Sequence, residues 1–151
     1  LYLSGNNAGA MVGNFLGDFV GGRHFEQHYQ PDVVRGIIMH RAIDAFTDGH
    51  AVVKISKARL RDKYRHYAPV NVDVFYDHIL ARQWAQYHSL SLEDFATHAY
   101  STLTAHMAAF PAEAQYVLPH MINGNWLVNY RTLEGIQQAL TGMSTRTRFQ
   151  S

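Results

Sequence analysis

Three polar side chains recur at every fourth position between residues 40 and 48, namely His40, Asp44 and Asp48. Residues four apart lie on one face of an α-helix, so the three would form a continuous polar stripe. A neutral imidazole and two carboxylates are suitable ligands for a divalent metal ion that prefers nitrogen and oxygen. Such triplets are also common on exposed helices, and spacing alone favours a solvated face with an ordinary His–Asp hydrogen bond.

A second pair of carboxylates, Asp73 and Asp77, shares a predicted helix face and is followed by His78. This helix is apolar over much of its circumference, with core candidates at Phe75, Ile79 and Leu80. Carboxylates on a largely buried helix need a partner or a metal ion. A structural salt bridge to an arginine, such as Arg41 or Arg82, is an equally good interpretation.

Asp18 is the only charged residue in the long apolar segment 8–20. Gly13 and Gly17 in the same segment would let another helix approach closely. Asp18 is therefore a third candidate for chemistry, although it would also suit a cap on a neighbouring helix or a pair with an arginine. Asn14 fits an ordinary buried polar residue equally well.

The segment 54–65 is basic, with six lysines and arginines and one acidic residue in a chain whose net charge is only +1. A local positive field of this kind steers acidic macromolecules toward a protein. Lys54, Lys57 and Arg61 are its candidate contact residues. A plain solvated helix face is the alternative, and it is favoured without further information.

Composition bounds these hypotheses. The chain has 151 residues, which suits one domain, and it contains no cysteine, so disulfides and thiolate ligands are excluded. Absence of cysteine also leads us to expect a cytoplasmic protein. The near-neutral charge gives no indication of a nucleic-acid partner, and no apolar run approaches the ~20 residues of a membrane span. No nucleophile motif, P-loop or zinc-protease helix is present.

Periodicity predicts an all-α protein, because apolar residues recur at helical spacing and strand-like alternation is rare. Gly21–Gly22 are expected to stop the first helix, and Pro69 is expected to close the third. We expect one domain over residues 1–151. The expected helices cover residues 8–20, 31–47, 51–67, 73–87, 92–110, 111–120, 126–130 and 132–140.

Four separated blocks of the chain resemble the acyl carrier protein phosphodiesterase family, in the same order and at compatible spacing. The blocks are Gly13–Asn14 with Gly17–Val20, Gly36–Asp44 with Thr47–Asp48, Asp73–His78 with Trp84, and Trp126–Tyr130 with Gly135, Ile136, Leu140 and Arg146. The family is a divergent branch of the HD-domain metal-dependent phosphohydrolases. The resemblance therefore implies a compact, all-α, HD-domain-like bundle and a divalent metal, typically manganese, with magnesium or another divalent ion as the alternative. The adjacent His–Asp pair typical of HD domains is replaced here by His40–Arg41, with Asp44 one turn later.

The resemblance also implies a reaction, namely hydrolysis of holo acyl carrier protein to apo acyl carrier protein and 4′-phosphopantetheine. We expect the metal ligands to be Asp18, His40, Asp44 and Asp77. Arg41 would clamp a phosphoryl oxygen, and His78 or Asp48 would exchange the proton on the leaving serine oxygen. The residues expected to contact the substrate are Asn14, Asp73, Lys54, Lys57 and Arg61.

Two other functions stay open. One is an HD-like phosphohydrolase acting on a nucleotide or another small phosphoester, and the other is a module that binds carrier protein without turnover. Members of the family begin with a short apolar segment that carries a histidine, and they extend further at the C-terminus. We therefore expect the sequence to be truncated at both ends.

Overall fold

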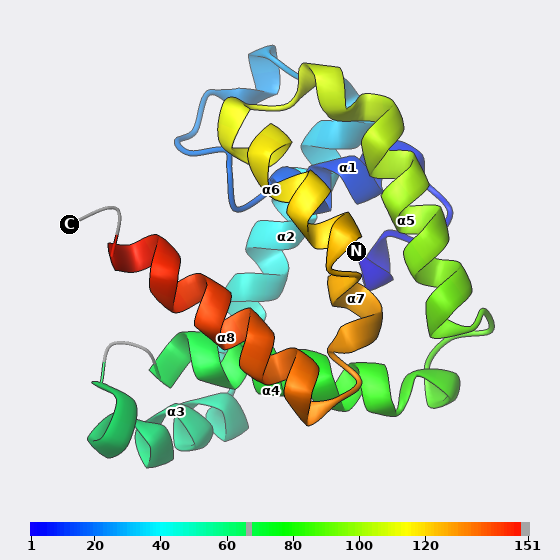
Figure 1. The fold of residues 1–151 in the computed structure, drawn as a ribbon. Coiled ribbons are helices and arrows are strands. Elements are labelled where there is room, and N and C mark those ends of the chain that lie inside the picture. Colours follow the sequence, from blue (N-terminus) through cyan, green and yellow to red (C-terminus); the bar gives the residue numbers. More distant parts are fainter. Residues whose placement is uncertain (66–67, 149–151) are drawn as a thin grey trace. The chain divides into compact units, whose positions relative to one another are not determined.

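The computed structural model describes residues 1–65 and 68–148, with the backbone alone for residues 64, 68–70 and 142–148 (Figure 1). No strand occurs in these ranges, so the all-α prediction is confirmed. The α-helices are α1 Ala8–Leu16, α2 Pro31–Gly49, α3 Ala51–Tyr64, α4 Ala68–Arg82, α5 Leu92–His106, α6 Ala112–Asn123, α7 Trp126–Asn129 and α8 Leu133–Arg148, with 3-10 turns at Tyr2–Ser4, Phe25–Gln27, Trp84–Gln86 and Met107–Ala109.

The chain divides into two units. The first comprises Leu1–Gly49 and Thr97–Asn123, and the second comprises His50–Ala96 and Gly124–Ser151. Within the described residues, no helix combines the length and apolar character that crossing a membrane requires.

Several helix boundaries differ from expectation: α4 covers Ala68–Arg82 rather than 73–87, α5 ends at His106 rather than Phe110, and α8 continues to Arg148 rather than Leu140. α1 ends at Leu16 rather than Val20, and Phe19 and Val20 donate their backbone N–H groups to the Leu16 carbonyl at 2.9 and 3.1 Å. Pro69 does not close the third helix but lies in the first turn of α4, where its missing N–H would have no helical partner. The third helix ends at Tyr64, and Tyr67, its expected end, lies outside the described residues.

Glycines bring α1 and α2 into backbone contact in the first unit. A Cβ on Gly13 would overlap the Val33 carbonyl oxygen, and a Cβ on Gly36 would overlap the Ala10 carbonyl oxygen. From one facing pair to the next, the residue number rises by four on both helices. The two helices therefore run in the same direction, with almost no space between them. These pairs are Gly9 with Asp32, Gly13 with Gly36, and Gly17 with His40.

The core of the first unit closes around this contact. The largest fully buried side chains of the described protein all belong to it, contributed by α1, α2, α5 and α6. They are Met11, Leu16, Ile37, Leu103 and Leu118. The α1–α2 contact is therefore closely packed, so a change of volume there should affect the whole unit.

In the second unit, α4 contacts its neighbours through polar groups as well as apolar ones. The hydroxyls of Ser56 on α3 and Tyr76 on α4 are 3.1 Å apart. His78 Nδ1 lies 2.7 Å from the backbone carbonyl oxygen of Tyr130, the residue that follows α7. These two contacts fix α4 against the segments on either side of it.

Not every apolar residue of α4 is buried as expected. Val74, His78 and Ala81 are buried, whereas Phe75 and Ile79 are 45% and 46% exposed. The two sets recur at three or four residues, so they define two different faces of the helix. The expectation that Phe75 and Ile79 are core residues is therefore wrong. Phe75 instead lines an open groove of about 390 Å³ with Leu133, Ile136 and Leu140 of α8.

Candidate metal centre

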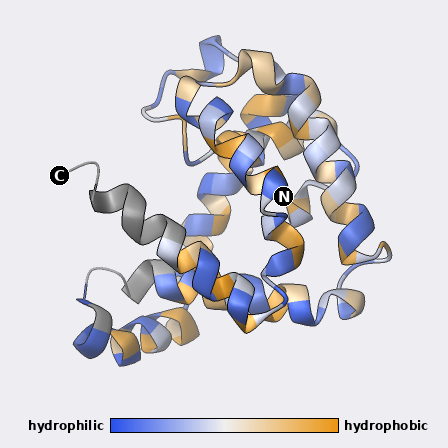
Figure 2. Cartoon of the chain, in the orientation of Figure 1, coloured by the Kyte–Doolittle hydropathy of each residue, from blue (hydrophilic) through white to orange (hydrophobic). Residues whose placement is uncertain are grey.

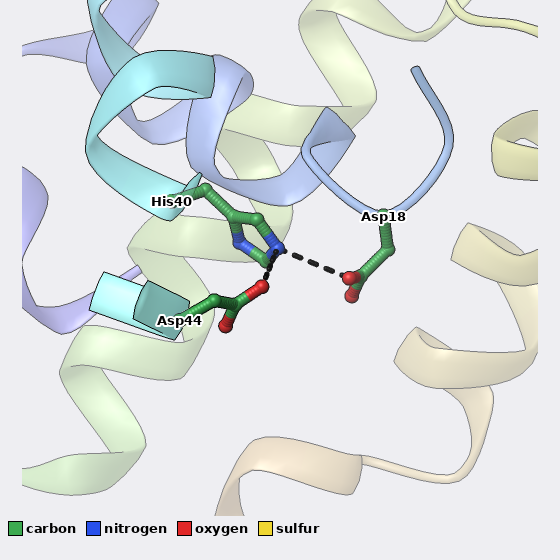
Figure 3. A group of neighbouring side chains, drawn as sticks. All are labelled: Asp18, His40 and Asp44. Atoms are coloured by element: carbon green, nitrogen blue, oxygen red, sulfur yellow. Dashed lines mark hydrogen bonds and ion pairs between the residues drawn. The ribbon is translucent and has the colours of Figure 1, made fainter. Parts of the chain in front are cut away.

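Asp18, His40 and Asp44 come together in the first unit (Figure 3). His40 Nε2 lies 3.0 Å from Asp18 Oδ1 and 3.2 Å from Asp44 Oδ2, so one ring nitrogen faces two carboxylates. Their ligand atoms all lie within 4.8 Å of one another. A single proton on Nε2 can be shared with both carboxylates only weakly, whereas one cation can contact all three atoms.

The three side chains reach this point by different routes. His40 and Asp44 are one turn apart on α2, which places them on one helix face. Asp18 comes from the turn that follows α1, and its own segment is closed by the hydrogen bonds to the Leu16 carbonyl. The ring of His40 occupies the space left by Gly17, because a Cβ there would overlap the His40 ring carbons.

The hydrogen bond between His40 and Asp18 shifts the pKa values of both groups. The hydrogen bond to His40 lowers the pKa of the Asp18 carboxyl, against an opposing effect of burial. The same hydrogen bond raises the pKa of His40, and burial opposes this as well. A proton on His40 and a metal ion compete for Nε2, because a ligating imidazole must be neutral.

The residues present fit a divalent cation. Two carboxylates and one imidazole are oxygen and nitrogen donors, the set that manganese, magnesium and zinc accept in proteins. The Asp18 and Asp44 side chains are 73% and 61% exposed, while that of His40 is 19% exposed. An ion and a substrate would therefore reach the carboxylates from solvent while the imidazole is held by the protein.

Comparison with known proteins decides the family. The family model described as acyl carrier protein phosphodiesterase matches residues 1–151. The chain belongs to the acyl carrier protein phosphodiesterase family.

Relatives that bear this name cover most of the chain. One from Yersinia pestis is 36% identical and one from Serratia proteamaculans is 37% identical, each over 97% of this chain and 76% of the relative. A third, from an Enterobacter species, is 38% identical over 91% of this chain and 71% of the relative. No solved structure matches the chain.

In this family member, Arg41 does not point a free guanidinium at the metal centre, as a clamp on phosphoryl oxygen would. Its Nη1 donates to the Gly22 carbonyl at 2.9 Å, and its Nη2 donates to the Val20 carbonyl at 3.1 Å. The guanidinium carbon also lies 4.5 Å from the centre of the Phe25 ring. In this structure Arg41 therefore binds the loop that follows Asp18, and its role as a clamp on phosphoryl oxygen stays a prediction.

Asn14 and Asp48 lie outside the group of three. Asn14 is buried, and its amide nitrogen lies 2.8 Å from Ser4 Oγ and 3.2 Å from Met39 Sδ. This geometry fits an ordinary buried polar residue, and a contact between Asn14 and the substrate stays a prediction. Asp48 is exposed near the end of α2, one turn beyond Asp44.

Asp73, Asp77 and His78 lie on α4 in the second unit. Burial of the carboxyl group, with the nearby charge of Asp73, raises the pKa of Asp77 to about 6, although the residue as a whole is exposed. His78 Nδ1 must carry a proton, because the Tyr130 carbonyl can only accept. Its Nε2 is then the nitrogen left to exchange protons. Asp77 as a metal ligand stays a prediction.

The basic segment is helical, as expected, and forms α3. Lys54 and Arg61 are exposed and Lys57 is half-buried. α3 also exposes Val52 and Ile55, so hydrophilic and hydrophobic residues alternate along it (Figure 2). A solvated surface of this composition can bind an acidic partner that also has apolar side chains.

Two features of the site were not read from the sequence. Gly17 was expected to admit a neighbouring helix, but not specifically to leave room for the ring of His40. The sequence does contain a signal for this close contact: Gly9, Gly13 and Gly17 recur at every fourth residue, and Asp18 follows the last of them. Arg41 binds two backbone carbonyl oxygens, which every residue type possesses. No sequence pattern could therefore indicate this contact.

Proposed function

We propose that this chain hydrolyses holo acyl carrier protein to apo acyl carrier protein and 4′-phosphopantetheine, with a divalent cation held by Asp18, His40 and Asp44. Family membership over the whole chain supports the reaction. The convergence of one imidazole nitrogen and two carboxylate oxygens supports the cation, and it is the observation that carries this part of the proposal. The ion is manganese, with magnesium or another divalent ion as the alternative.

The side chains have distinct parts in this mechanism. His40 offers Nε2, Asp18 and Asp44 offer one oxygen each, and Asp77 is the proposed further ligand. When bound, a divalent cation lowers the pKa of water and neutralises charge on phosphoryl oxygens. His40 must lose its proton for the ion to be held, so binding should weaken as the pH falls.

The leaving serine oxygen of the carrier protein needs a proton. We assign this transfer to His78 or Asp48, and such a group contributes about 10²- to 10⁴-fold to the rate. For His78 the transfer would involve Nε2, since Nδ1 is used by the Tyr130 carbonyl. Asp73 remains a proposed substrate contact beside Asp77 on α4.

The basic face of α3 would receive the carrier protein. Carrier proteins are small and strongly acidic, so Lys54, Lys57 and Arg61 supply the complementary charge. The residues assigned here lie on both units, and we therefore propose that residues 1–151 act as one functional domain. The cysteine-free composition supports a cytoplasmic location for this reaction.

The test is intact mass spectrometry of holo acyl carrier protein incubated with this protein and Mn²⁺. We expect loss of the phosphopantetheine mass, abolished by a chelator and restored by added Mn²⁺. Asp44→Asn should lose turnover, whereas Asp94→Asn, an exposed acid on α5, should keep it.

Four results would overturn parts of the proposal. Turnover that survives the chelator, or that Asp44→Asn leaves intact, would contradict the metal role. Hydrolysis of free nucleotides without action on holo carrier protein would point to a small phosphoester as substrate. Binding of carrier protein without any turnover would point to a non-catalytic module.

A further inference from the structure

Arg41 connects α2 to the loop that carries Asp18. Its two donors bind the Val20 and Gly22 carbonyl oxygens at 3.1 and 2.9 Å, and its guanidinium lies over the Phe25 ring at 4.5 Å. Three contacts from one side chain thus span residues 20–25. A planar fork of donors suits this arrangement, because it can reach two carbonyls while its face covers an aromatic ring.

The loop needs such a support because of its own sequence. The loop contains two consecutive glycines, Gly21 and Gly22, and Gly22 has a positive φ of 79°, a backbone conformation that favours glycine. Asp18 lies two residues before Val20, so the anchored carbonyl is close along the chain to the ligating carboxylate. Glycines lose more conformational freedom on ordering than other residues, and the Arg41 contacts offset that cost.

The anchoring residue and two of the ligands share one helix. Arg41 follows His40 directly and precedes Asp44 by three residues on α2. The Arg41 contacts therefore hold the Asp18 loop against the same helix that supplies the other ligands. Any movement of that loop away from α2 would break the Asp18–His40 contact of 3.0 Å as well.

We infer that Arg41 is a positioning residue of the metal centre, which acts by holding Asp18 at His40 and Asp44. The inference rests on the proposed function, because it assumes that these residues hold a cation. A role as a clamp on phosphate would require Arg41 to give up both carbonyl contacts. Partners that orient metal ligands typically contribute about 10- to 100-fold to metal affinity.

The experiment compares Mn²⁺ affinity of the metal-free protein and its variants by titration calorimetry. Arg41→Met keeps an unbranched, apolar side-chain stem and removes all donors, and we expect about 10-fold weaker binding. Arg41→Lys should recover part of the loss, since one ammonium can bind one carbonyl. Arg35→Met, at an exposed arginine on the same helix, is the matched control and should bind like the wild type.

A double-mutant cycle separates positioning from a general loss of structure. If Arg41 acts through Asp18, then Arg41→Met should change affinity less than twofold in an Asp18→Asn background. Equal effects in both backgrounds would overturn the inference, and so would an unchanged affinity in Arg41→Met alone. Circular dichroism would confirm that each variant retains its helices.

Amide hydrogen exchange measures the local stability of the Asp18 loop without any cation. In the metal-free protein, Arg41→Met should speed exchange of the Phe19 and Val20 amides, which donate to the Leu16 carbonyl. Faster exchange with unchanged affinity would overturn the inference but leave the proposed function standing. A wild-type protein that binds no Mn²⁺ would instead overturn the metal role in the proposed function, and the positioning role with it.

Discussion

Replacing Gly17 by alanine should displace His40 and impair the metal centre more than it destabilises the fold. An added Cβ would overlap Cγ and Cδ2 of the His40 ring and would lie 2.7 Å from its Cβ. The backbone itself accepts alanine, because Gly17 has φ −53° and ψ −35°, in the right-handed helical region. The perturbation is therefore one of space, not of backbone strain.

The expected magnitude follows from these contacts. Overpacking of a close contact costs about 1–3 kcal/mol, while Gly→Ala at a compatible backbone position returns about 0.5–1 kcal/mol through the unfolded state. We expect the free energy of unfolding to fall by about 1–2 kcal/mol. At the site, a displacement of a ligand by about 1 Å costs on the order of 10²-fold in rate.

Two assays test this prediction. Denaturant unfolding gives the stability change, and Mn²⁺-dependent turnover of holo acyl carrier protein gives the effect on the site. Gly49→Ala is the matched control, because an added Cβ at the end of α2 meets open space. It should leave turnover at its wild-type value and should raise the free energy of unfolding by no more than about 0.5–1 kcal/mol.

Repeating Gly17→Ala in a His40→Ala variant tests whether the added Cβ overlaps His40. His40→Ala removes Cγ and Cδ2, the two nearest atoms, so the stability cost of Gly17→Ala should fall to less than about half in that background. The same cost in both backgrounds would refute the packing argument. Wild-type turnover in Gly17→Ala would refute the claim that this contact sets the position of His40.

Three further predictions address other parts of the chain. Reversing charge on α3 with Lys57→Glu and Arg61→Glu should slow association with carrier protein by about 10-fold at low salt and much less at 1 M salt. Stopped-flow binding measures the association rate, with Arg82→Glu on α4 as the control. A slower rate that salt does not change would contradict this prediction. Asp77→Asn should stabilise the metal-free protein by about 1 kcal/mol above pH 6, because a folded pKa raised to about 6 penalises the charged carboxylate, and the gain should fade as the pH falls from 6 to 4. Urea unfolding of both proteins across this pH range measures the gain, and a gain independent of pH would contradict the prediction. Asn14→Ala should lower the free energy of unfolding by about 1–3 kcal/mol, because it leaves the buried Ser4 hydroxyl without this partner, and a loss below 0.5 kcal/mol in urea unfolding would contradict it.

The helices could be predicted because their signals are local. Pro31–Asp32 begin α2 and Ser91 caps α5, with its hydroxyl accepting from the Asp94 N–H at 3.1 Å. Pro69 was misjudged because a proline can end one helix or begin the next, and its position alone does not decide between them. The side of α4 that is buried was also misjudged, since both of its faces carry apolar residues and periodicity cannot rank them.

The candidate site could be predicted only where its geometry is local. His40 and Asp44 are one turn apart, so the helix alone brings them together. Asp18 lies 22 residues before His40, and its approach depends on the packing of α1 on α2. Residue spacing offered a cap or an arginine as partners of Asp18, and the resemblance to a family supplied its assignment as a ligand.

The proposed carboxylate ligands are exposed and the residues that support them are buried, so the two proposals can be tested separately. Asp18 and Asp44 are exposed, whereas Gly13, Gly36 and Ile37, at the contact between α1 and α2, are buried. A carboxylate changed to an amide at the surface loses a metal ligand with little loss of packing, so Asp44→Asn reports the chemistry. Changes at Gly17 or Arg41 leave every ligand in the sequence and alter only where the ligands lie. If position matters as the glycine contacts and the Arg41 contacts imply, the second kind of change should weaken metal binding although all donor atoms are retained.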